Sequence, residues 1–219
     1  MQKPLFRQQL YPALGQYLES TLTGLHTVPE ARRALLRQTG GYLRQKQQAQ
    51  QPASLLFICT HNSRRSHLAQ IWAAVAARYF GLGRLQTFSG GTEATALHPH
   101  AVAALEQAGF RVEKPGGDNP RYQLFFAEEH APLICFSKKY NHPANPQAAF
   151  GAVMVCADAE QNCPFVPGAE KRFALKYEDP KASDGSGKET LVYAERSWQI
   201  ATEMCWLMRE VALSPATRL

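Results

Sequence analysis

The sequence lacks a long apolar run. Among its 219 residues, 45% of them hydrophobic, no stretch reaches the roughly 18 consecutive apolar residues that a transmembrane helix needs. Lys3 and Arg7 are not followed by the apolar region of a secretory signal peptide. We therefore expect a cytoplasmic protein without a membrane partner. The length predicts one ordinary domain with an appendage, or two small domains.

Cysteine is scarce, and its count of five is odd. An odd count does not suit a framework of paired disulfides. It fits a reducing compartment, where thiols act as nucleophiles, bind metals or pack in the core. A chain of this length can bury a core without disulfide or metal supports. Its composition is not that of a disordered chain, and its glycines and prolines show no period.

The net charge of +6 is concentrated in residues 1–51, which alone carry +5 and leave +1 for the rest of the chain. This segment has only two acidic residues, Glu19 and Glu30. Its basic residues are Lys3, Arg7, Arg32, Arg33, Arg37, Arg44 and Lys46. The positive charge of the chain therefore belongs to an N-terminal segment.

Apolar residues at helical spacing predict two helices in this segment, over residues 11–25 and from Pro29 toward the Gln-rich residues 45–51. Thr27 is a candidate cap for the second helix, and Gly40-Gly41 is a candidate break. We interpret residues 1–51 as a basic helical extension that packs on the main domain with a solvated charged face. A nucleic-acid-binding arm is the alternative. It is disfavoured because interleaved aromatics and a binding motif are missing, so we expect no nucleic-acid partner.

From residue 52 onward, strands alternate with helices. In chain order we predict a strand at 55–58, a helix at 66–79, a strand at 85–88, a helix at 98–108, strands at 152–156 and 172–177, and a helix at 196–211. This order favours an α/β fold with a parallel, helix-covered sheet, where ligands bind at the C-terminal ends of the strands. Residues 122–136 break the order and predict an inserted β-hairpin.

The loop after the first predicted strand suits oxyanion chemistry. It runs Cys59-Thr60-His61-Asn62-Ser63-Arg64-Arg65-Ser66 and leads directly into a helix. A strand-to-helix loop can direct its backbone N–H groups at a tetrahedral anion, and the helix N-terminus adds positive charge. Arg65 can bind two oxygens of that anion. The same field favours a Cys59 thiolate, to which Ser66 can donate a hydrogen bond. A Cys-x5-Arg spacing alone is weak, and its position between strand and helix is what supports it.

This loop resembles the anion-binding loop of the low-molecular-weight protein tyrosine phosphatase superfamily, which includes the thioredoxin-coupled arsenate reductases. The resemblance continues through residues 88–92 and His98-Pro99, and resumes from Val153 to the last helix. It implies a catalytic domain over residues 52–219 with a four-stranded parallel sheet and helices on both faces. The extension and residues 111–150 lie outside the resemblance.

Two further cysteines, Cys156 and Cys163, flank a short segment after another apolar run. Taken alone, Cys156 is a buried structural cysteine and Cys163 an incidental exposed thiol. A zinc site is a further option, disfavoured because a second matched pair of ligands is missing. Cys156, Asp158, Asn162, Cys163 and Pro164 resemble the redox segment of the thioredoxin-coupled arsenate reductases. The resemblance implies a relay in which Cys59 attacks arsenate and Cys156 attacks the resulting adduct. Cys163 then forms a disulfide with Cys156, which thioredoxin reduces.

Asp179-Pro180 follows the last predicted strand. Alone, an aspartate before a proline indicates a turn. The resemblance implies that Asp179 is the general acid that protonates the leaving oxygen. Lys181-Ala182 is closer to the reductases than to the phosphatases, which often have tyrosines at these positions. Gln70 replaces a glutamate that helps to hold potassium in some reductases, so the resemblance does not carry a potassium site over.

We therefore predict a cysteine-dependent oxyanion enzyme, first an arsenate reductase with catalytic Cys59, Arg65, Asp179, Cys156 and Cys163. The alternative is a tyrosine phosphatase that hydrolyses phosphotyrosine through a phosphocysteine at Cys59. A non-catalytic phosphate-binding module is a third reading, disfavoured because nucleophile and acid are both present. Expected partners are a small oxyanion and thioredoxin, or a phosphotyrosine protein in the alternative. We expect no cofactor and no metal, and Cys135 and Cys205 are expected to pack in the core.

Overall fold

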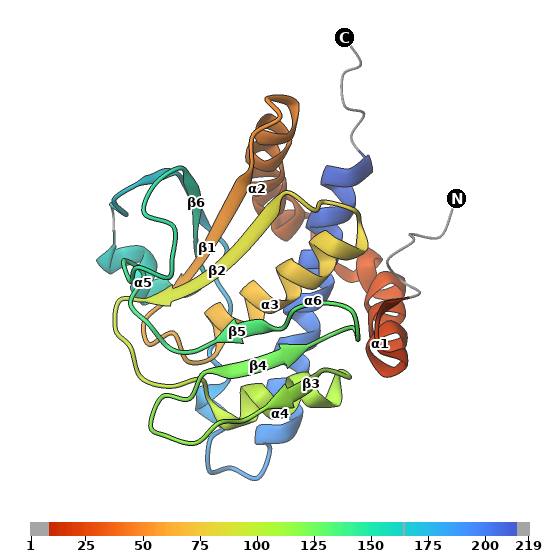
Figure 1. Ribbon diagram of the computed structural model, residues 1–219, viewed down its shortest axis with the longest axis vertical. Helices are drawn as coiled ribbons and strands as arrows, with labels where there is room; N and C mark the ends of the chain where they lie inside the picture. The colour runs from red at the N-terminus through yellow and green to blue at the C-terminus, as the bar shows by residue number, and fades with distance from the viewer. Residues whose placement is uncertain (1–8, 164, 214–219) are drawn as a thin grey trace.

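A four-stranded parallel sheet lies at the centre of the fold (Figure 1). The computed structural model describes residues 9–163 and 165–213. The strand order is β2-β1-β6-β7, with β1 at Ala53–Cys59, β2 at Leu85–Gly91, β6 at Phe150–Met154 and β7 at Ala169–Ala174. All four predicted strands are present, and the predicted α/β class is confirmed. Because β1 is buried along almost its whole length, its apolar run is explained by cover on both faces.

Four of the other described helices pack against the last one, α6 (Glu189–Leu213), whereas the short α5 contacts β1 and β6. The others are α1 (Pro12–Thr23), α2 (Glu30–Gln48), α3 (Arg65–Tyr79), α4 (Pro99–Gln107) and α5 (Ala157–Asn162), with 3-10 turns at Gly24–Thr27 and Pro180–Ser183. The Ala-rich α3 packs against both α6 and the sheet, so it is buried on almost every side. None of the described helices combines the length and the apolar character that crossing a bilayer requires.

The insertion is a three-stranded antiparallel sheet, ordered β3-β4-β5. Its strands are β3 (Arg111–Glu113), β4 (Tyr122–Phe125) and β5 (Leu133–Cys135). The predicted hairpin corresponds to β4 and β5, whereas β3 was not predicted because it is short and two of its three residues are exposed. After β5 the chain runs beside the end of β2, where Gly91 N–H donates to the Lys138 carbonyl at 2.9 Å.

Helices α1 and α2 form the N-terminal segment. The predicted break at Gly40-Gly41 is wrong, because α2 continues through both residues. Gly40 is buried, and the space where its Cβ would stand is already bordered by Leu207 of α6 at 3.3 Å. Packing against α6 therefore outweighs the low helix propensity of the pair. Thr27 is not the cap of α2, since its hydroxyl donates back to the Gly24 carbonyl at 2.7 Å.

The N-terminal segment is built into the core. Leu14, Leu18 and Leu36 are each at most 1% exposed, and Tyr11 N–H donates to the Phe126 carbonyl of the insertion at 3.1 Å. Gly109, at φ +102°, lets the chain pass so close to α1 that a Cβ there would stand 2.4 Å from the Leu14 nitrogen. Helix α1 thus packs on α6 and its leading residues contact the insertion, while α5 lies on the opposite side of the molecule (Figure 1).

Candidate active site

The loop between β1 and α3 surrounds the predicted nucleophile. Cys59 is the last residue of β1 and is 4% exposed. Its Sγ lies 3.1 Å from the Ser66 hydroxyl oxygen, which also accepts a hydrogen bond from Asn62 Nδ2 at 2.8 Å. Because Asn62 is the donor in that second bond, the proton of the Ser66 hydroxyl is available to the Cys59 sulfur.

Asn62 ties this loop to the insertion. It has a positive φ of +45°, a conformation that asparagine tolerates better than most residues. Its Oδ1 accepts a hydrogen bond from the Lys138 N–H at 2.9 Å, and the Ser137 hydroxyl donates to the His61 carbonyl at 3.0 Å. The chain after β5 therefore stabilises the loop through the hydrogen bonds of Ser137 and Lys138.

The loop carbonyls are engaged by the surrounding fold. The Thr60 carbonyl accepts from Glu93 N–H at 2.8 Å, and the Ser63 carbonyl accepts from His98 N–H at 2.9 Å. In a trans peptide the N–H group points opposite to the carbonyl. The N–H groups of the same peptide units therefore face the other way, which is the arrangement that an anion-binding nest needs.

Arg65 and Asp179 meet across the mouth of the loop. Arg65 Nη2 donates to Asp179 Oδ2 at 2.5 Å, and Nη1 donates to the Tyr177 carbonyl at 3.0 Å. With Cys59 they line a hollow of about 10 Å³, together with His61, Ser63 and Arg64. That volume holds about one water molecule. An anion bound by Arg65 Nη2 would take the place that the Asp179 carboxylate holds there.

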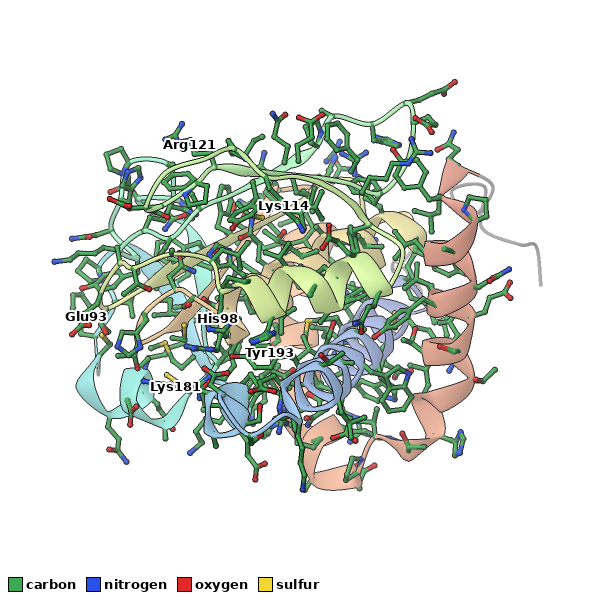
Figure 2. All side chains as sticks on the ribbon, turned by 90° about the horizontal axis from the view of Figure 1, so that it is seen from below. Glu93, His98, Lys114, Arg121, Lys181 and Tyr193 are labelled. Carbon is green, nitrogen blue, oxygen red and sulfur yellow. The ribbon has the colours of Figure 1, made fainter. Side chains whose placement is uncertain are left out.

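Arg64 fastens the segment that follows Asp179. Its Nε donates to the Tyr193 hydroxyl at 2.6 Å and its Nη2 donates to Asp184 Oδ2 at 2.8 Å, while the Tyr193 hydroxyl donates to Asp184 Oδ1 at 2.7 Å. Burial alone would raise the pKa of Asp184, but the bond from Tyr193 and the charge of Arg64 outweigh burial and lower it. Tyr193 stacks on His98, with ring centroids 5.4 Å apart (Figure 2). The Arg64 guanidinium is thus engaged beside the hollow.

Cys156 lies beside the loop. Strands β1 and β6 are parallel neighbours, and Ile58 lies opposite Met154. Val155 and then Cys156 follow Met154 in the chain. Its Sγ is 3.6 Å from the Thr60 hydroxyl oxygen, and the residue is 1% exposed. Neighbouring strands are about 4.8 Å apart, so the ends of β1 and β6 place Cys156 near Cys59. A disulfide needs Cα atoms within roughly 7 Å.

Cys163 lies at the other end of α5. Cys156 precedes this helix and its sulfur accepts the Ala159 N–H at 3.3 Å, while Cys163 follows the last helical residue. Helical rise puts the two Cα atoms roughly 10 Å apart, which is too far for a disulfide unless α5 unwinds. Burial raises the pKa of Cys163, although the charge of Arg172 opposes this. Pro164, which the sequence pattern includes, lies outside the described residues.

The remaining cysteines are in the core. All five cysteines are free and buried. Burial raises the pKa of Cys135 and of Cys205 to about 12, which agrees with their predicted packing role. Residues 9–163 and 165–213 contain no group of three or more His, Cys, Asp or Glu side chains that could hold a metal ion.

Sequence reasoning missed a buried histidine behind the loop. His67, in the first turn of α3, is fully buried, and its Nδ1 lies 3.2 Å from the Ser89 hydroxyl oxygen. Burial lowers the pKa of His67 to about 3, with the Lys138 charge contributing in the same direction. The residue is therefore neutral in the folded protein. Nothing in the local sequence distinguishes it from an ordinary helical histidine.

The sequence of this chain is similar to those of known proteins. The model of the family "Low molecular weight phosphotyrosine protein phosphatase" matches residues 54–119. A curated arsenate reductase of Bacillus subtilis is 28% identical over 142 residues, covering 65% of this chain and 84% of the relative. One from Halalkalibacterium halodurans is 26% identical over 135 residues, covering 62% and 79%.

The fold has a solved counterpart. A crystal structure of a low-molecular-weight phosphotyrosine phosphatase from Vibrio cholerae matches with a TM-score of 0.50, over 72% of this chain and 95% of that chain. At 15% sequence identity, this match shows the fold and does not bear on the reaction.

Proposed function

We propose that this chain, which matches the low-molecular-weight phosphotyrosine phosphatase model over residues 54–119 and resembles curated arsenate reductases, is a thiol-dependent arsenate reductase. The observation that carries the proposal is the position of Cys156 directly beside the Cys59 loop, with Cys163 at the other end of the short helix α5. A hydrolytic phosphatase needs neither thiol. The arsenate reductases of two bacterial genera among its relatives support the same reading.

The first step uses the groups around the hollow. The Cys59 thiolate attacks the arsenic(V) atom, forming a sulfur–arsenic bond while one arsenate hydroxyl group leaves. Asp179, in its carboxylic acid form once Arg65 has released it, protonates that hydroxyl group, which leaves as water. Arg65, released from Asp179, and the loop N–H groups hold the remaining oxygens. Ser66 and the N-terminus of α3 stabilise the thiolate before attack.

The second step is the reduction. The Cys156 thiolate attacks the Cys59 sulfur, forming a disulfide, and the electron pair of the sulfur–arsenic bond passes to arsenic. Arsenic(V) becomes arsenic(III) and leaves as arsenite, while two thiols are oxidised to one disulfide. The neighbouring strand ends of β1 and β6 supply the approach that this attack requires.

The third step frees the nucleophile. Cys163 attacks the Cys156 sulfur and releases the Cys59 thiolate, leaving a Cys156–Cys163 disulfide. Because α5 separates these residues by roughly 10 Å, the step requires this helix to unwind. A dithiol protein such as thioredoxin then supplies two electrons and two protons to restore both thiols.

The second candidate function is phosphotyrosine hydrolysis. It uses the same Cys59, Arg65 and Asp179, with Asp179 activating water to hydrolyse a phosphocysteine. The match of the family model to residues 54–119 favours it, because this segment holds Cys59 and Arg65. Cys156 and Cys163 have no role in that reaction.

One comparison separates the two functions. Arsenate-dependent NADPH oxidation, coupled through thioredoxin and thioredoxin reductase, is measured beside p-nitrophenyl phosphate hydrolysis for wild type and Cys156→Ser. We expect Cys156→Ser to abolish arsenate turnover. Cys135→Ala, a change at a buried cysteine outside the relay, serves as the matched control and should keep it. Hydrolysis of the aryl phosphate without any arsenate reduction by wild type would establish the phosphatase instead.

A further inference from the structure

The side chain of Arg32, in the N-terminal segment, binds residues of the main domain. It lies in the first turn of α2, which packs beside α6 (Figure 1). Its Nε and Nη2 donate to the two carboxylate oxygens of Glu203 at 3.0 and 2.6 Å, and its Nη1 donates to the Lys176 carbonyl at 3.0 Å. One side chain of the extension thus holds both α6 and the segment that leads to Asp179.

Glu203 is a buried carboxylate that depends on this arginine. Its side chain is 3% exposed, and that of Arg32 is 19% exposed. Its other partners are neutral, namely the Tyr177 hydroxyl at 2.8 Å and Gln199 Nε2 at 3.3 Å. A buried charge without its counter-ion is strongly destabilising. Removal of Arg32 would therefore disturb the position of Glu203 and of the groups bound to it.

Tyr177 connects this carboxylate to the active site. Its ring lies under the Arg32 guanidinium at 4.9 Å, and its hydroxyl is bound to Glu203. Its backbone carbonyl accepts a hydrogen bond from Arg65 Nη1 at 3.0 Å, two residues before Asp179. The side chain of Tyr177 is therefore fixed by Arg32 and Glu203, while its backbone carbonyl binds Arg65.

We infer that Arg32 is a positioning residue for the oxyanion site, acting through Glu203 and Tyr177 to fix Arg65 and Asp179. The N-terminal segment thereby contributes to the site through Arg32, which acts on Glu203 and Tyr177 and not on the reacting atoms. The inference rests on the proposed function only in assuming that Arg65 binds the oxyanion, an assumption that the reductase and the phosphatase share.

The test compares Arg32→Met with Arg37→Met. Arg37 lies in the same helix and pairs with Glu30 of α2 at 2.5 Å, at an exposed position. We expect Arg32→Met to lower kcat/KM roughly 10- to 100-fold, because small displacements of binding groups are costly, and Arg37→Met to leave it unchanged. Rates are taken per folded enzyme, with the folded fraction measured by circular dichroism.

Milder variants separate positioning from folding. Tyr177→Phe removes only the hydroxyl and should lower kcat/KM in the same direction, by less than Arg32→Met. In the double variant Arg32→Met/Glu203→Gln no buried charge is left, and the amide oxygen still accepts the Tyr177 hydroxyl. We expect this double variant to regain most of the lost kcat/KM. Arg32→Lys, which keeps the charge, should fall between wild type and Arg32→Met.

A second readout does not depend on turnover. Alkylation of Cys59 by iodoacetate is followed by mass spectrometry with increasing inorganic phosphate. If Arg65 is displaced, the phosphate concentration for half-protection should rise about tenfold in Arg32→Met. A wild type that reduces no arsenate would count against the proposed function alone, because this measurement still reports on Arg65. The inference is overturned if folded Arg32→Met keeps wild-type kcat, KM and phosphate protection, or if the double variant regains nothing.

Discussion

Asn62 has a structural role in the anion loop that is separate from those of the nucleophile and the arginine clamp. It has a left-handed backbone and bonds both Ser66 and Lys138. Two separate costs therefore follow from its loss. One is the loss of hydrogen bonds, and the other is backbone strain in any replacement that has a Cβ.

A pair of substitutions separates these costs. Asn62→Gly loses the hydrogen bonds but accepts a positive φ, whereas Asn62→Ala loses the bonds and is also strained. We expect both substitutions to lower the free energy of unfolding. The value for Asn62→Ala should be about 1 kcal/mol below that for Asn62→Gly. Urea denaturation measures the difference. Equal stabilities would show that the loop backbone relaxes out of the left-handed region.

His67 makes stability depend on pH. Its pKa falls from the ordinary 6.5 to about 3 on folding, because burial opposes its charged form. Below pH 6.5 the unfolded chain therefore binds a proton that the folded chain does not, and stability is lost as pH falls toward 3.

When the pH falls from 7.5 to 5.5, His67 should lower the free energy of unfolding by about 1.4 kcal/mol. In His67→Gln, where the side chain does not titrate, the decline over the same interval should be smaller by that amount. Urea denaturation of both proteins at the two pH values gives the comparison. The same decline in both would mean that His67 accepts a proton within the fold.

Single residues differ in how far sequence reveals them. Cys59 and Arg65 are visible because one short loop joins an apolar strand to a helix. Tyr177, Glu203 and Arg32 carry no such mark, since their contacts join residues 32, 177 and 203 only after the chain has folded. A sequence motif describes residues close together in the chain, so it does not reveal polar contacts between residues this far apart.

At the scale of elements, α2 shows how packing decides a helix. Its Gly40-Gly41 pair predicts a break, yet the helix is continuous because α6 covers Gly40. Gly41 faces a different environment. A Cβ there would meet only Arg44 Nη2, at 3.9 Å. The two neighbouring glycines therefore differ in their surroundings, because there is room for a Cβ at Gly41 and little room at Gly40.

The two glycines should respond differently to the same change. Gly41→Ala should raise the free energy of unfolding by about 0.5–1 kcal/mol, because it removes backbone entropy from the unfolded chain without a clash. Gly40→Ala should gain less, because its Cβ would press on Leu207 at 3.3 Å and on Arg44 at 3.2 Å. Thermal and urea denaturation of both variants test this order, and equal gains would contradict it.

Short elements were the hardest to predict. The central strands β1 and β6 are apolar because both of their faces are covered, so each of them has a clear signal in the sequence. β3 has three residues, two of them exposed, and is defined only by its pairing with β4. The short α5 and the 3-10 turn after Asp179 are likewise set by their ends, where Cys156 and Asp179 accept backbone N–H groups.

At the scale of the whole molecule, the charge of the N-terminal segment is largely used within the fold. Arg32 pairs with Glu203 at 2.6 Å and Lys46 pairs with Glu170 at 2.7 Å. Arg33 donates to the His26 carbonyl at 3.0 Å. The sequence predicts a basic segment with two helices, and α1 and α2 are both present in it. The use of its charges to hold the main domain could not be predicted, because the acidic partners lie more than 100 residues away along the chain.

The proposed reaction depends on one event, the passage of two electrons from Cys59 and Cys156 to arsenic. In Cys163→Ser the relay should stop after this step. We expect one equivalent of arsenite per enzyme from a single addition of arsenate, together with a Cys59–Cys156 disulfide found by mass spectrometry of unreduced peptides. An enzyme that releases no arsenite and keeps both thiols free would contradict the account.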